Sequence, residues 1–104
     1  MTNANTILQQ IKASVLSVKP SASVILYGSY ARGSNHNNSD IDILVLVDKL
    51  LTQHEKMRIE YPLYDIEFET GILISPIIFS KTNWETKNNI APFYHSIIKE
   101  GKLL

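Results

Sequence analysis

Two aspartates, Asp40 and Asp42, carry the clearest chemical signal in the sequence. They stand at the start of an apolar run over residues 41–47, whose Ile and Val content predicts a β-strand buried on both faces. Side chains two residues apart on a strand point to the same face, with Cα atoms about 6.5–7 Å apart. Mg²⁺ prefers oxygen ligands and is often held by one or two carboxylates together with substrate phosphates. The pair therefore predicts a magnesium site.

A glycine and a serine, Gly28 and Ser29, follow the preceding apolar run over residues 23–27. Because glycine lacks a side chain, the backbone at Gly28 can approach a ligand closely. The turn that follows would direct backbone N–H groups and the Ser29 hydroxyl outward, which suits a bound anion. Phosphate donors at the end of one strand and metal ligands at the start of the next would meet at a nucleoside triphosphate.

Two other interpretations of these residues are weaker. Gly28 could be a plain turn glycine, but Asp42 inside an apolar strand is costly to bury without a partner or a metal. A P-loop is the rival phosphate motif, because Gly28 and Gly33 match its glycine spacing. It is excluded, since Ser34 and Asn35 stand where a P-loop requires Lys and then Ser or Thr.

The elements that must position these residues alternate along the chain. The hydrophobic periodicity predicts helices over residues 6–18 and 52–70, and strands over residues 23–27, 41–47 and 72–79. Short helices are expected around Trp84 and after Pro92. This order favours an α/β (α+β) fold, in which a small mixed β-sheet carries helices packed on it.

The region over residues 52–70 fits two patterns. Met57, Tyr61, Tyr64 and Phe68 lie on one helical stripe, yet residues 64–69 also alternate between apolar and acidic, as in a strand. A helix is favoured, with a kink or break at Pro62 and a C-terminal stop at Gly71.

Three further boundaries can be predicted. Thr6 with Gln9 predicts a capping box at the start of the first helix. Pro76 predicts an edge strand or a bulge. The last helix is expected to carry Pro92 in its first turn and an apolar face made of Phe93, Tyr94, Ile97 and Ile98.

Composition bounds what the chain can be. Its 104 residues predict one domain over residues 1–104. Ten basic and ten acidic residues cancel, which argues against general nucleic-acid binding. The absence of cysteine excludes disulfides and thiolate chemistry. We expect a cytoplasmic protein, because neither a signal peptide nor an apolar run of about 20 residues is present.

Gly28-Ser29, ten residues, and then Asp40-x-Asp42 resembles the signature of the DNA polymerase β-type nucleotidyltransferases. The longer string GSYARGSNHNNSDIDILV resembles the minimal nucleotidyltransferase (MNT) domains of prokaryotes. The resemblance implies a nucleotidyltransferase-like core, with catalytic Asp40 and Asp42 ligating Mg²⁺ and Gly28 and Ser29 binding the triphosphate.

Three more residues fall within the resembled nucleotide-binding segment: Arg32, Gly33 and Ser39. Arg32 and Gly33 match the ARG part of the pattern. Arg32 could support the phosphate loop or pair with an acid. Ser39 could cap the loop rather than act in the chemistry.

The resemblance also implies an activity and a partner. It implies transfer of a nucleoside monophosphate, most plausibly AMP from ATP, to a hydroxyl group of a partner protein. MNT domains often accompany HEPN-domain proteins in toxin–antitoxin modules, so the chain is expected to be the antitoxin of such a pair. Transfer to a nucleic acid or an antibiotic is disfavoured. A homodimer is plausible, because a small sheet leaves edges to cover.

One departure from the family pattern favours an alternative. A third carboxylate is expected on the strand over residues 72–79, but that strand contains no acid, and Ser75 stands near the expected position. Glu67 or Glu69 could substitute only if the backbone brought them close. The alternative is therefore a catalytically weak or inactive nucleotide-binding antitoxin or regulatory subunit that acts by binding its partner.

Overall fold

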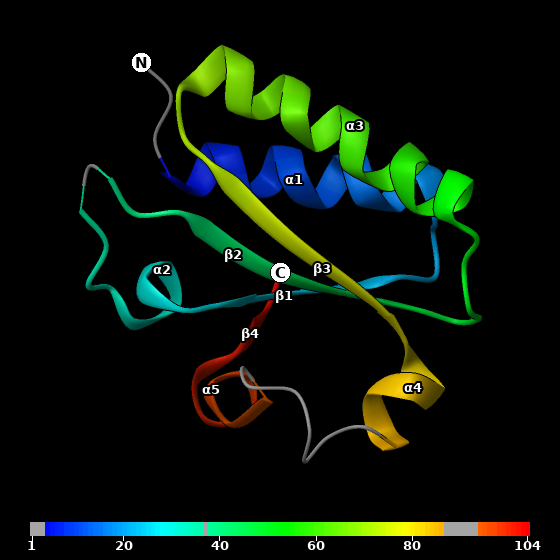
Figure 1. Cartoon of the computed structure of the whole chain (residues 1–104). Coiled ribbons are helices and arrows are strands. Elements are labelled where there is room, and N and C mark those ends of the chain that lie inside the picture. The colour runs from blue at the N-terminus through cyan, green and yellow to red at the C-terminus, as the bar shows by residue number, and fades with distance from the viewer. Residues whose placement is uncertain (1–3, 37, 87–93) are drawn as a thin grey trace.

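The computed structural model describes residues 4–36, 38–86 and 94–104 (Figure 1). Four strands form one sheet in the order β3-β2-β1-β4. These strands are β1 (Ser23–Tyr27), β2 (Ile41–Val47), β3 (Ile74–Ser80) and β4 (Lys102–Leu103). β1 pairs antiparallel with β2 and β4, whereas β2 pairs parallel with β3. The predicted mixed sheet is therefore confirmed.

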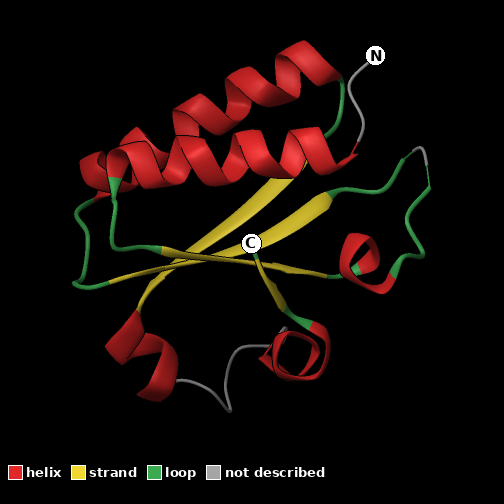
Figure 2. Ribbon diagram, turned by 180° about the vertical axis from the view of Figure 1, so that it is seen from behind, coloured by secondary structure: helices red, strands yellow, loops and turns green. Residues whose placement is uncertain are grey.

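Helices cover both faces of the sheet. The long helices α1 (Ala4–Val18) and α3 (Gln53–Thr70) lie on one face, and the short helices α4 (Lys81–Thr86) and α5 (Tyr94–Glu100) lie on the other (Figures 1 and 2). The one-turn helix α2 (Ser29–Arg32) lies at the end of β1.

The strand β2 divides the core. Its residues Ile41, Ile43, Val45 and Val47 belong to the larger cluster under α1 and α3. Leu44 belongs to a smaller cluster with Ile97 of α5 and, at its margin, Trp84 of α4. Because side chains alternate along a strand, Asp42 shares the α4/α5 face with Leu44. The two cores thus decide on which face of the sheet the aspartate lies.

α3 is one continuous helix through Pro62, so no break occurs there. Thr52 and Glu55 form a capping box at its start: Thr52 N donates to Glu55 Oε1 at 3.1 Å, and Glu55 N donates to Thr52 Oγ1 at 3.2 Å. Gly71 ends the helix in the left-handed conformation, with φ 74°, as predicted. Ile59 and Leu63 are fully buried against the core.

Some boundary predictions are wrong. α1 begins at Ala4, so Thr6 lies inside the helix and cannot cap it. Ile98 is 63% exposed, because α5 buries only its Ile97 side. The predicted positions of Pro92 and Phe93 lie outside the described residues. β4 was not predicted, because a two-residue strand has no periodicity to detect.

The position of β3 confirms another expectation. β3 is an edge strand, so it pairs with a neighbouring strand on one side only. Pro76, which has no backbone N–H to donate, is tolerated at such a position. Within the described part of the chain, no helix is both long and apolar enough to cross a membrane.

Candidate active site

Gly28 is the hinge between β1 and α2. Its backbone adopts φ 75° and ψ −155°, and its carbonyl accepts hydrogen bonds from Ala31 N and Arg32 N, both at 3.1 Å. A Cβ atom placed at Gly28 would lie 2.4 Å from Oδ2 of Asp42. Glycine is therefore required twice, by the positive φ and by the aspartate that fills the space beside it. The group that lies beside the Gly28 backbone in this structure is the Asp42 carboxylate.

Asp42 lies in the middle of the sheet, between two neighbouring strands. Its backbone pairs with Tyr27 on β1 and with Ser75 on β3. Burial raises the pKa of Asp42, the negative charge of Asp40 raises it further, and the Arg32 guanidinium lowers it. The two carboxylates are thus close enough to interact, as their spacing predicts.

Asp40 lies just before β2 and contacts β3. Ser75 Oγ donates a hydrogen bond to Asp40 Oδ2 at 3.3 Å. A neighbouring cavity of about 200 Å³ is lined by the segment before β2 and the segment before β3. Its lining residues are Asn38, Ser39, Asp40, Gly71, Ile72 and Leu73. The carboxylate of Asp40 therefore borders open space on the β3 side.

The donor set suits a hard divalent cation. Two half-buried carboxylates repel each other, and a cation bound between them would stabilise both in the charged form. Mg²⁺ prefers oxygen ligands of this kind. Across residues 4–36, 38–86 and 94–104, however, no group of three or more Asp, Glu, His or Cys side chains is placed to hold a metal. A resident Mg²⁺ would have to complete its shell with substrate or water.

Ser75 stands where a third carboxylate was expected. It is the register partner of Asp42 and donates to Asp40, so it contacts the site from β3. Glu67 does not replace it, because its Oε1 accepts the backbone N–H of Ile74 at 2.7 Å. Glu69 is exposed and, like Glu67, belongs to no cluster with the two aspartates among the described residues.

The loop residues have structural partners. Arg32 Nη1 donates to Glu100 Oε2 at 2.7 Å, an ion pair that joins α2 to the end of α5. Ser39 Oγ accepts from His36 N at 2.9 Å, which closes the loop before Asp40. Gly33 has φ 74° and ends α2. These contacts agree with the acid-pairing alternative for Arg32 and the loop-capping alternative for Ser39.

Tyr27 is a neighbour that the sequence patterns did not single out. It is the last residue of β1 and is buried beside Leu44. Burial, with a contribution from the Asp42 charge, raises its pKa to about 12. The phenol therefore stays protonated and neutral next to the carboxylates. In the sequence, only the position of Tyr27 directly before Gly28 indicates that it lies near the aspartates.

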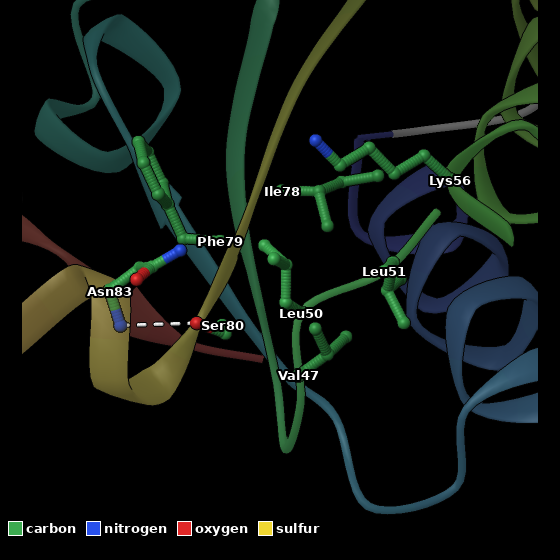
Figure 3. A pocket seen from close by; sticks show the side chains of 8 residues that line it. All are labelled: Val47, Leu50, Leu51, Lys56, Ile78, Phe79, Ser80 and Asn83. Atoms are coloured by element: carbon green, nitrogen blue, oxygen red, sulfur yellow. Dashed lines mark hydrogen bonds between the residues drawn. The ribbon is translucent and has the colours of Figure 1, made fainter. Parts of the chain in front are cut away.

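A second cavity lies at the opposite end of the sheet. It has a volume of about 210 Å³ and lies where β2 and β3 end, with Lys56 of α3 reaching over it (Figure 3). Its lining contains no carboxylate, and Ser80 Oγ is occupied as the acceptor of Asn83 N at 3.1 Å. This cavity therefore lacks the carboxylates that would hold a metal ion.

Residues 9–104 match the family model described as polymerase beta, nucleotidyltransferase. The chain belongs to this family. Two proteins of Methanocaldococcus jannaschii, each named "Putative protein adenylyltransferase", are similar to it. MJ0141 is 48% identical over 59 residues, which cover 57% of this chain and 60% of MJ0141. MJ0604 is 32% identical over 85 residues, which cover 78% of this chain and 75% of MJ0604.

The fold agrees with solved structures of the same type. A toxin–antitoxin crystal structure with AMP-PNP superimposes with a TM-score of 0.63, covering 91% of this chain and 69% of that chain, at 20% identity. This likeness shows that the chain shares the fold of that structure. The expected nucleotidyltransferase family and its α/β architecture are therefore confirmed.

Replacing Gly28 tests the contact with Asp42. We expect Gly28→Ala to lower the free energy of unfolding by about 2–6 kcal/mol, combining backbone strain of about 1–3 kcal/mol with overpacking of about 1–3 kcal/mol. Gly33→Ala is the control for a positive φ without a neighbour, because Gly33, at φ 74° and ψ 16°, has nothing within 4 Å of the added Cβ. Urea unfolding measures both variants, and equal losses would contradict a specific contact with Asp42.

The raised pKa of Asp42 makes a prediction for the metal-free protein. A carboxyl whose folded pKa is raised stabilises the fold when protonated, and this contribution is lost as the pH rises through the folded pKa. Asp42→Asn should therefore raise the thermal midpoint at pH 7 in the presence of EDTA. This gain in the thermal midpoint should disappear below pH 3.8, where the carboxyl group is protonated in both the folded and the unfolded chain; 3.8 is the ordinary pKa of the group. Thermal unfolding across this pH range is the measurement, and a gain that persists at low pH would refute it.

Proposed function

We propose that this chain is a Mg²⁺-dependent nucleotidyltransferase domain that transfers AMP from ATP to a hydroxyl group of a partner protein, with release of pyrophosphate. The observation that carries the proposal is the convergence of Asp40, Asp42 and the Gly28-Ser29 turn at one end of the sheet. Family membership supports the reaction class. The names of MJ0141 and MJ0604 support a protein as the acceptor.

Each residue has a role in this proposal. Gly28 and Ser29 bind the triphosphate, the Ser29 hydroxyl acting as a donor to phosphate oxygen. Gly33 shapes the turn, Ser39 holds the loop before Asp40, and Arg32 supplies positive charge near Asp42. Asp40 and Asp42 would hold Mg²⁺, which when bound neutralises phosphate charge and orients the triphosphate.

The position of Ser75 shapes the reaction that we propose. Its hydroxyl can orient Asp40, as its hydrogen bond indicates, but a neutral hydroxyl is a poor base. The proton of the attacking hydroxyl must therefore pass to Asp40, to water or to a group of the acceptor. We expect slow transfer that depends on how the acceptor presents its hydroxyl.

The partner that we propose is a HEPN-type protein, with this chain as the antitoxin of the pair. The resemblance to MNT domains supports this partner, and the toxin–antitoxin structure that shares the fold contains AMP-PNP. Because the proposed reaction uses ATP and Mg²⁺, we expect it to occur in the cytoplasm. The chain spans 60% of the length of MJ0141 over the matched region, and residues 1–104 are proposed as one catalytic domain.

A second function is favoured by one observation, the absence of an acid at position 75. A site with two carboxylates can bind nucleotide and turn over little. The chain would then neutralise its partner by binding alone.

Label transfer tests the first function. The protein, its genomic-neighbour partner, Mg²⁺ and ATP labelled at the α-phosphate should yield labelled partner. Asp42→Asn should lower the rate at least about 100-fold, because one metal ligand and its charge are lost. Asp65→Asn is the matched control on the exposed surface of α3 and should leave the rate unchanged. Full neutralisation of the partner by Asp42→Asn, with no label transfer by wild type, would support the binding function instead.

Restoring an acid at β3 tests the role of Ser75. Ser75→Asp places a carboxylate beside Asp40 and Asp42, where it can share the cation and accept a proton. We expect transfer to become about 10-fold faster or more at saturating Mg²⁺, within the usual range for a general base. Ser75→Asn is the control of similar size without the charge. A Ser75→Asp variant that is slower than Ser75→Asn would show that the site does not use a third carboxylate.

A further inference from the structure

The helix α3 has two apolar faces. With about 100° per residue, Ile59, Leu63 and Ile66 point towards the core. Met57, Tyr61, Tyr64 and Phe68 lie within an arc of about 60° on the opposite side; these four residues are called the outer stripe. Because Ile59, Leu63 and Ile66 pack on the core, the outer stripe on the opposite side of α3 faces away from it. Figure 1 shows α3 at the top of the molecule.

Three of the four residues of the outer stripe are exposed, and Met57 is half-buried. Phe68 is 91% exposed, Tyr61 56% and Tyr64 44%. The rings of Tyr61 and Tyr64 contact each other, with centroids 6.2 Å apart, so the aromatic surface is continuous. Contiguous apolar surface of this kind marks an interaction site more often than isolated exposed residues do.

The charges beside the outer stripe change sign along the helix. On one flank, Arg58 lies in the N-terminal half, and Asp65 and Glu69 lie in the C-terminal half; all three are exposed. The other flank carries one base and two acids, namely Lys56, Glu60 and Glu67. In a parallel two-fold pair the first flank of one copy lies beside the other flank of the second copy, so Asp65 and Glu69 would lie beside Glu67.

Antiparallel pairing has the opposite effect. A two-fold axis at the centre of the outer stripe sets Tyr61 against Tyr64 of the second copy, and Met57 against Phe68. The same axis brings Arg58 beside Asp65 and Glu69 of the second copy on the same flank. An isologous contact repeats each of these pairs twice, and flanking charge pairs set the orientation of paired helices.

The sheet edges are less suited to a second copy. β3 carries Pro76, which lacks a backbone N–H for strand pairing, and β4 has only two residues. We therefore propose that two copies of this chain associate through the outer stripe, with their α3 helices antiparallel. This proposal is independent of the proposed catalytic function. A seam of one helix pair is about 27 Å long, so the dimer should be weak.

Sedimentation velocity from low micromolar to near-millimolar concentration tests the proposal. Wild type should pass from monomer to dimer within this range. Phe68→Glu should weaken the dimer at least about tenfold, because a charge would replace an aromatic ring that the proposed contact buries against Met57 of the second copy. Ile98→Glu is the matched control, because Ile98 is a similarly exposed apolar residue on α5, across the sheet. Circular dichroism checks that each variant is folded.

A charge exchange tests the orientation. Arg58→Glu and Glu69→Arg should each weaken the dimer, because each places like charges together, and the double variant should restore it. A chain that stays monomeric at near-millimolar concentration would overturn the proposal and leave the outer stripe to a different protein. A dimer that Phe68→Glu does not affect, or that Ile98→Glu weakens equally, would also overturn it. A double variant that is weaker than both single variants would overturn the antiparallel arrangement.

Discussion

The contact between the Asp42 carboxylate and the Gly28 backbone is the constraint on which the site depends. It joins the end of β1 to the start of β2 and leaves no room for a side chain at position 28. Because Gly28 also turns the chain into α2, the same contact fixes where Ser29 lies relative to the two aspartates. The cost is a charged group held between strands, which burial and Asp40 make less acidic.

The rest of the fold supports this arrangement through β2. One side of β2 fills the large core under α1 and α3, and the other side presents Leu44 to α5 and Asp42 to the site. A one-residue shift of register would exchange these faces and bury the carboxylate under the long helices. The parallel pairing with β3 then decides that Ser75 is the neighbour of Asp42.

The aspartate end of the sheet and the outer stripe of α3 are separate regions of the surface. The end of the sheet that carries the aspartates is polar and bordered by a cavity at Asp40. The outer stripe lies on α3, across the long-helix layer from the sheet, and contains none of the site residues. Association through α3 would therefore leave the proposed nucleotide site open to an acceptor.

The sequence by itself determined the family, the mixed α/β sheet and the pairing of the site aspartates, because glycine, aspartate and strand periodicity are local signals. The sequence patterns wrongly predicted a helix cap at Thr6 and a buried position for Ile98, and they did not predict β4. These features depend on which segments meet in space. Only the tertiary structure decided that Gly28 makes room for Asp42, that Arg32 pairs with Glu100, and that Glu67 accepts a hydrogen bond from the Ile74 backbone and does not join the two aspartates. The physical reason is that each of these contacts joins residues that are distant in sequence or set on different elements, so no local pattern encodes it.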